Sequence, residues 1–101
     1  MRSCRVLAVR LSIDSVATPV DYADVFVVVR EGEEGPGPSD WEANVRTSDR
    51  QHLAPGTYQL EVDTVDGHVL AGRALLRFSD GSQHLFRGDG HLAGAAQVLA
   101  S

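Results

Sequence analysis

Three Asp-Gly doublets divide the last third of the chain into short β-like segments. The doublets are Asp66-Gly67, Asp80-Gly81 and Asp89-Gly90. Asp-Gly is favoured in tight hairpin turns, because these turns need a positive φ that glycine adopts without steric cost. The runs between the doublets are rich in Val, Leu and Phe. Together they predict an antiparallel meander with strands at 58–63, 69–78 and 83–88.

The first half of the chain carries strand patterns as well. Residues 6–13, "VLAVRLSI", alternate and place four apolar side chains on one face: Leu7, Val9, Leu11 and Ile13. Such a period of two predicts a half-buried strand. Residues 25–30, "VFVVVR", are apolar on both faces and β-branched, which predicts a strand covered on both sides. Residues 41–47, "WEANVRT", alternate again.

No stretch of helical length before residue 90 has helical periodicity, so we predict an all-β fold in one domain over 1–101. The expected architecture is a small antiparallel β-barrel or sandwich of about 6–7 strands with a C-terminal hairpin meander. The fragment "LAPGTYQLEV" is similar to a strand-entry pattern of immunoglobulin-like and prealbumin-like sandwich modules. The acidic, Gly/Pro-rich residues 31–40 are expected to form a mobile loop. Residues 91–99 favour a strand or irregular structure because Gly94 interrupts them, although their alanines also suit a helix.

The register of the meander contains a conflict. A two-residue turn at Asp66-Gly67 would send Arg73 and Arg77 into the core, where an unpaired charge costs several kcal/mol. One extra residue near Gly72 reverses the alternation beyond it, so we predict a β-bulge or sharp bend at Ala71-Gly72. The core face that results is Tyr58, Leu60, Val62, Val69, Ala71, Ala74, Leu76, Phe78 and Leu85.

The same register exposes a candidate interaction face on the outside of the sheet. Its members are Arg73, Leu75, Arg77, His84 and Phe86. Leu75 would lie opposite Phe86, and Arg77 opposite His84. An apolar pair ringed by cations is typical of an interaction patch. The candidate interaction face could be covered by another protein, by a second copy of this chain, or by another part of the same chain.

The histidines and acids show no spacing that predicts chemistry. His68 and His91 each follow a doublet, but unequal strands would separate them by about 16 Å at about 3.3 Å per residue, too far to share a zinc ion. The sequence has no GxSxG elbow, glycine-rich phosphate loop or HExxH motif. We therefore predict no catalytic residues, no metal and no cofactor.

Charge and cysteine content limit the partner and the compartment. The net charge is −5 and the nine basic residues, all Arg, are scattered, which argues against nucleic acid as the main partner. Cys4 is the single cysteine, so no internal disulfide forms. The opening "MRSCRVLAVRLSID" lacks the apolar length of a signal peptide or membrane span. Arg without Lys suits a GC-rich bacterial genome, and the cytoplasm is the expected compartment.

These observations favour a non-catalytic binding or accessory β domain. It would dock to a protein partner, or self-associate as a homo-oligomer, through the candidate interaction face. The alternative is a small-ligand-binding or enzymatic barrel in which Trp41 and Tyr58 line a cavity and His84 acts as acid or base. Such a cavity takes core volume that a chain of 101 residues can scarcely spare.

Overall fold

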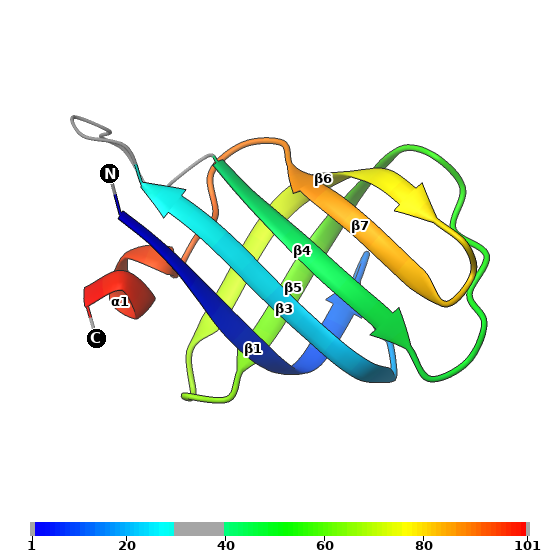
Figure 1. The fold of residues 1–101 in the computed structure, drawn as a ribbon, viewed down its shortest axis with the longest axis horizontal. Helices are drawn as coiled ribbons and strands as arrows, with labels where there is room; N and C mark the ends of the chain where they lie inside the picture. Colours follow the sequence, from blue (N-terminus) through cyan, green and yellow to red (C-terminus); the bar gives the residue numbers. More distant parts are fainter. Residues whose placement is uncertain (1, 30–39, 101) are drawn as a thin grey trace.

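The computed structural model describes residues 2–29 and 40–100, which form β-strands and one short helix (Figure 1). The elements are β1 (Arg2–Ile13), β2 (Val16–Ala17), β3 (Val20–Val29), β4 (Asp40–Thr47), β5 (Thr57–Thr64), β6 (Val69–Ser79), β7 (Gln83–Gly88) and α1 (Ala95–Ala100). The loop expected over 31–40 lies outside the described residues, apart from Asp40, the first residue of β4.

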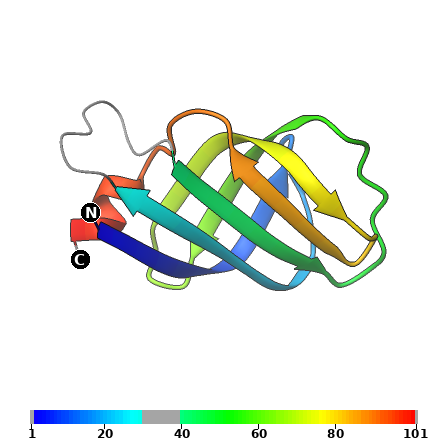
Figure 2. The ribbon, with the colours of Figure 1, turned by 45° about the horizontal axis from the view of Figure 1, so that its top comes forward.

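The strands form one antiparallel sheet in the order β2-β1-β3-β4-β7-β6-β5. Because β1 also pairs with β5, six of the strands close into a barrel (Figures 1 and 2). The two-residue strand β2 pairs with the end of β1 and is not one of these six. Hairpins join β5 to β6 and β6 to β7. The all-β prediction and the small antiparallel barrel with a C-terminal meander are confirmed.

Strand β1 closes the barrel because it serves two neighbours in turn. Residues 2–7 pair with β3, whereas residues 8–13 pair with β5. The register with β5 shifts between Ala8 and Arg10, so the intervening Val9 is an extra residue. A bulge of this kind bends a strand and increases its twist, which a small barrel needs where a strand changes partner.

The bulge also reverses the alternation of β1. Val6 is buried before it, and Leu11 and Ile13 are buried after it. Leu7 and Val9 are 46% and 55% exposed. The prediction of one shared buried face is therefore right for Leu11 and Ile13 and wrong for Leu7 and Val9. The apolar residues alternate without a break in the sequence, whereas the bulge exchanges the buried and exposed faces of the strand.

The turn between β5 and β6 is one residue longer than predicted. The Thr64 amide donates to the His68 carbonyl at 2.8 Å, which leaves 65–67 as the loop, with Gly67 at φ +86°. Three-residue hairpin loops commonly end in such a residue. The extra residue lies in the turn, and the register runs evenly through Ala71-Gly72. The predicted bulge at Ala71-Gly72 is wrong.

A bulge does occur further along β6, at Arg77, where the register with β7 shifts between Leu76 and Phe78. Arg77 and Phe78 both face outward as a result. Leu76 pairs with Phe86 on the inner side of the sheet. Two assignments to the core are wrong because of this bulge, since Phe78 is 53% exposed and its partner Leu85 also faces outward. Two more are wrong because the extra residue lies in the turn before β6, which places Val69, 53% exposed, and Ala71 on the outer side.

Trp41 fills one end of the barrel. Its side chain is 2% exposed, and its Nε1 donates to the Gly90 carbonyl at 2.9 Å. A Cβ placed on Gly72 or Gly88 would lie 2.8 or 2.2 Å from the indole ring. Glycine at these two positions is therefore what allows the strands to approach the ring.

The C-terminal segment covers the same end of the barrel, where β1 begins and β3 ends (Figures 1 and 2). Ala93 forms an isolated bridge with Ala71, and Gly94 at φ +88° then turns the chain into α1. Leu92 and Ala95 are buried beneath this turn. The strand or irregular structure preferred for 91–99 is thus wrong over 95–99, because a helix begins directly after Gly94, where we expected a strand to be interrupted.

Candidate functional site

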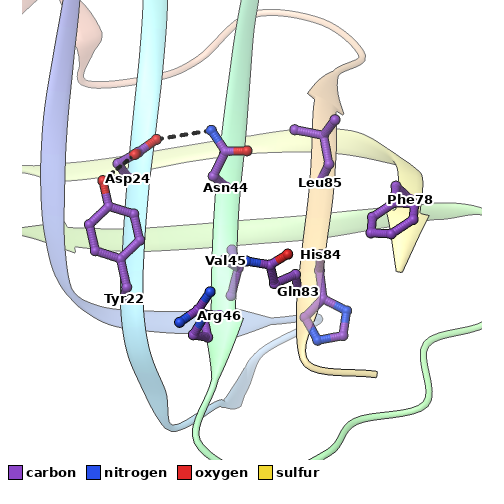
Figure 3. Close-up of a pocket in the computed structure, with 9 residues that line it drawn as sticks. All are labelled: Tyr22, Asp24, Asn44, Val45, Arg46, Phe78, Gln83, His84 and Leu85. Carbon is purple, nitrogen blue, oxygen red and sulfur yellow. Dashed lines mark hydrogen bonds between the residues drawn. The ribbon is translucent and has the colours of Figure 1, made fainter. Parts of the chain in front are cut away.

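An open groove of about 610 Å³ lies on the outside of the barrel, at the end away from α1 (Figure 3). We call it the outer groove, and its lining residues are Tyr22, Asp24, Asn44, Val45, Arg46, Phe78, Gln83, His84 and Leu85. They come from four strands that are adjacent in the sheet, namely β3, β4, β7 and β6.

The pairing of these strands sets the shape of the outer groove. Asp24, Asn44, Leu85 and Phe78 form one row of paired residues across the sheet. A strand spacing of about 4.8 Å makes that row about 14 Å wide. The walls are aromatic, because the side chains of Tyr22 and Phe78 stand at opposite sides and are 46% and 53% exposed (Figure 3).

Asp24 is a buried carboxylate on the outer side of the barrel, only 2% exposed. It forms an ion pair with Arg5, whose Nη1 lies 3.0 Å from Oδ2. Asn44 Nδ2 donates to its Oδ1 at 3.2 Å, and the Tyr22 hydroxyl donates to Oδ2. The Arg5 guanidinium also lies 5.2 Å from the centre of the Phe26 ring, in cation–π geometry. The buried charge is therefore paired and hydrogen-bonded, as it must be to persist.

This network fixes two groups that face the outer groove. Asp24 holds the Tyr22 hydroxyl and so positions the aromatic wall. Asp24 also accepts a hydrogen bond from the side-chain amide nitrogen of Asn44, so the Asn44 side-chain carbonyl oxygen points toward β7 (Figure 3). The groove thus offers a hydrogen-bond acceptor whose orientation is set before any ligand arrives.

Replacing Asp24 with asparagine is expected to lower the pKa of Tyr22. The hydrogen bond to Asp24 is the main cause that raises this pKa, helped by burial and by the negative charge of Asp24, while Arg5 opposes it. The substitution removes the charge and the strong acceptor, so the phenol should ionise at lower pH. Tyr22 and Tyr58 are the two tyrosines of the chain. The absorbance of phenolate, titrated in a Tyr58→Phe background, reports Tyr22 alone, and an unchanged titration would mean that the contact does not form.

His84 lies beneath the outer groove and is 2% exposed. Its Nδ1 lies 2.7 Å from the Ser79 hydroxyl and its Nε2 3.3 Å from the Thr47 hydroxyl. Burial lowers the pKa of His84, and the charge of Asp80 opposes that shift. No carboxylate hydrogen-bonds to the ring within the described part of the chain, so the Ser79–His84 pair lacks the orienting acid of a hydrolase triad.

The structure separates the five residues of the predicted interaction face. Arg73, Leu75 and Arg77 do face outward on β6. His84 and Phe86 lie in the barrel interior, and Phe86 is 0% exposed, so the prediction is wrong for these two. The reason is the bulge at Arg77, which pairs Leu76 instead of Leu75 with Phe86. Leu85 and Arg87 of β7 take the outward positions.

Trp41 and Tyr58, the residues proposed to line a cavity, pack as core residues. Trp41 occupies the space beside Gly72 and Gly88. The Tyr58 ring meets Phe86 edge to face at 6.0 Å, and its hydroxyl donates to the Ala54 carbonyl. The contacts of these two aromatic residues are those of interior packing.

Residues 2–29 and 40–100 contain no group of three or more His, Cys, Asp or Glu side chains placed to hold a metal ion. Within the same residues, no helix has the length and hydrophobicity needed to cross a membrane. No protein-family model matches the sequence, and searches of curated proteins and of solved structures found no match.

Proposed function

We propose that this chain is a non-catalytic β-barrel domain that binds protein through the outer groove. The observation that carries the proposal is the pair of exposed aromatic walls, Tyr22 and Phe78, with Leu85 between them on the floor. Aromatic residues dominate the binding energy of protein interfaces because they bury a large area at a small cost in conformational entropy.

Preorganisation of the groove supports the same proposal. Tyr22 and Asn44 are held by Asp24 in the free protein, so a bound chain does not have to order them. Binding sites that are ordered in advance lose less entropy on association.

The bound protein is a partner or a second copy of this chain. Cys4, a lone cysteine, suits a reducing compartment, and we place the domain in the bacterial cytoplasm.

Phe78→Asp is expected to weaken binding by about 2 kcal/mol or more, roughly thirtyfold, because it removes an aromatic wall and buries a charge in its place. Peptides are selected from a random-peptide library on the immobilised wild-type protein, and their affinities are then measured for the variants. Val69→Asp is the matched control, since Val69 and Phe78 lie at opposite ends of β6 and are both 53% exposed.

The proposal requires the selected peptides to bind the wild type and Val69→Asp equally well. Peptides that bind Phe78→Asp as tightly as the wild type would contradict it. Light scattering over a concentration series tests the second copy as the bound protein. If a second copy binds in the groove, the average molecular mass of the wild type rises with protein concentration. The mass of Phe78→Asp then stays that of one chain.

A further inference from the structure

We infer that the outer groove takes an extended, acidic polypeptide segment and that Arg46 pairs with one of its carboxylates. This inference rests on the proposed function and names the chemistry of the partner. It follows from the unpaired charge of Arg46 in the groove and from the width between the aromatic walls.

The four strands that form the groove, β3, β4, β7 and β6, carry no net charge within an acidic chain. They contain four arginines, Arg46, Arg73, Arg77 and Arg87, and four acids, Asp21, Asp24, Asp40 and Glu42. The whole chain has a net charge of −5. Because Asp24 is already paired with Arg5, the unpaired charge inside the groove, among the described residues, is that of Arg46, and such a cation orients an oppositely charged group of a partner.

Arg46 is the arginine inside the outer groove, and it is exposed. It forms no ion pair within the described residues. Asp21 and Asp80 line an adjoining depression that Arg46 also lines, but neither pairs with it. Asp21 accepts a hydrogen bond from the Ser48 hydroxyl, and Asp80 accepts two from backbone amides. The planar guanidinium is therefore available to a carboxylate, which it can bind through two parallel hydrogen bonds.

The walls favour an extended segment over a helix. The row from Asp24 to Phe78 spans about 14 Å between backbones, and the thickness of two aromatic rings reduces the free width below the roughly 10–12 Å diameter of a helix. The Asn44 carbonyl oxygen on the floor can accept a hydrogen bond from a backbone amide of an extended chain. Apolar side chains of that segment would contact Leu85 and Phe78.

Basic and aromatic side chains also bind single-stranded nucleic acid. A phosphate backbone, however, places a charge at every nucleotide and needs a track of cations. Among the described residues that line the outer groove, Arg46 is the one cation. One cation at one position matches a single carboxylate better than a run of phosphates.

The test uses the peptides selected on the wild-type chain. We expect them to carry an Asp or Glu beside apolar residues, and Arg46→Glu to weaken their binding by roughly tenfold or more. Arg73→Glu is the control, because Arg73 is paired with Asp89 at 3.2 Å and does not line the groove. Peptides with lysine in place of the acid should regain affinity for Arg46→Glu.

The other outcomes separate this inference from the proposed function. Peptides whose binding is lost with Phe78→Asp, yet which are neutral or basic or bind Arg46→Glu unchanged, overturn the inference and leave the proposed function standing. A library that yields no peptide sensitive to Phe78→Asp overturns both. Binding of an oligo(dT) strand that Phe78→Asp abolishes, measured by fluorescence anisotropy, overturns the inference in favour of nucleic acid.

Discussion

Phe86→Ala is expected to lower the free energy of unfolding by about 3–5 kcal/mol. Phe86 is 0% exposed and lies edge to face against Tyr58 at 6.0 Å. The substitution removes a large buried apolar area, leaves a cavity in a closed barrel that cannot easily collapse, and breaks an aromatic pair. Urea denaturation followed by Trp41 fluorescence measures the change.

Phe78→Ala is the matched control for this prediction. Phe78 is 53% exposed and projects from the bulge of β6, so its removal should cost less than about 1 kcal/mol. Phe78 and Phe86 thus test the register of the hairpin between β6 and β7 directly. A larger loss of stability for Phe78→Ala than for Phe86→Ala would place Phe86 outside, as the sequence suggested, and would contradict the bulge at Arg77.

Gly88→Ala is expected to cost about 3 kcal/mol, which is large for the addition of one methyl group. The new Cβ would lie 2.2 Å from Nε1 of Trp41 and 2.5 Å from two further ring atoms. The indole is buried and cannot swing aside, so the strand or the ring has to move. Movement of the ring also breaks its hydrogen bond to the Gly90 carbonyl.

A double-mutant cycle identifies the cause of that cost. In a Trp41→Leu background the ring is absent, and Gly88→Ala should destabilise the chain by much less than it does in the wild type. Unfolding free energies of the four proteins from urea denaturation give the coupling. Additive costs would show that the two positions do not touch.

The class of the fold was predictable because its signals are local. Gly67, Gly81 and Gly90, the glycines of the three doublets, all adopt positive φ, at +86°, +94° and +122°. The alternation in β4 and β5 matches their burial. Turn residues and apolar periodicity depend only on residues that are close in the sequence, so strands and hairpins can be predicted from them.

The faces of the strands were less predictable, because a one-residue difference in register exchanges the buried and exposed sides. The conflict at Arg73 predicted one extra residue at Ala71-Gly72, whereas the structure has it in the turn at 65–67. The sequence did not distinguish a longer turn at 65–67 from a bulge at Ala71-Gly72, since either removes the conflict. That choice exchanged Leu70 for Val69 and Ala71 in the core. The later bulge at Arg77 moved Phe86 into the core and Phe78 out of it.

The outer groove could not be predicted, because it depends on which strands become neighbours. Tyr22 and Asp24 reach Asn44 through the pairing of β3 with β4, and Leu85 joins them because β4 pairs with β7. β4 and β7 are far apart in the sequence, and no local pattern specifies that they pair. The acid at Asp24, within an apolar run, was the one available signal, since a buried charge implies partners.

The central claim is that the outer groove is the surface on which this chain binds protein. Amide chemical shifts of the labelled wild-type chain, recorded as a library-selected peptide is added, test it most directly. We predict the largest shift changes at Tyr22, Asn44, Gln83 and Leu85, with little change along β5 and in α1. Largest changes in β5 or α1, with the groove residues unmoved, would contradict the claim.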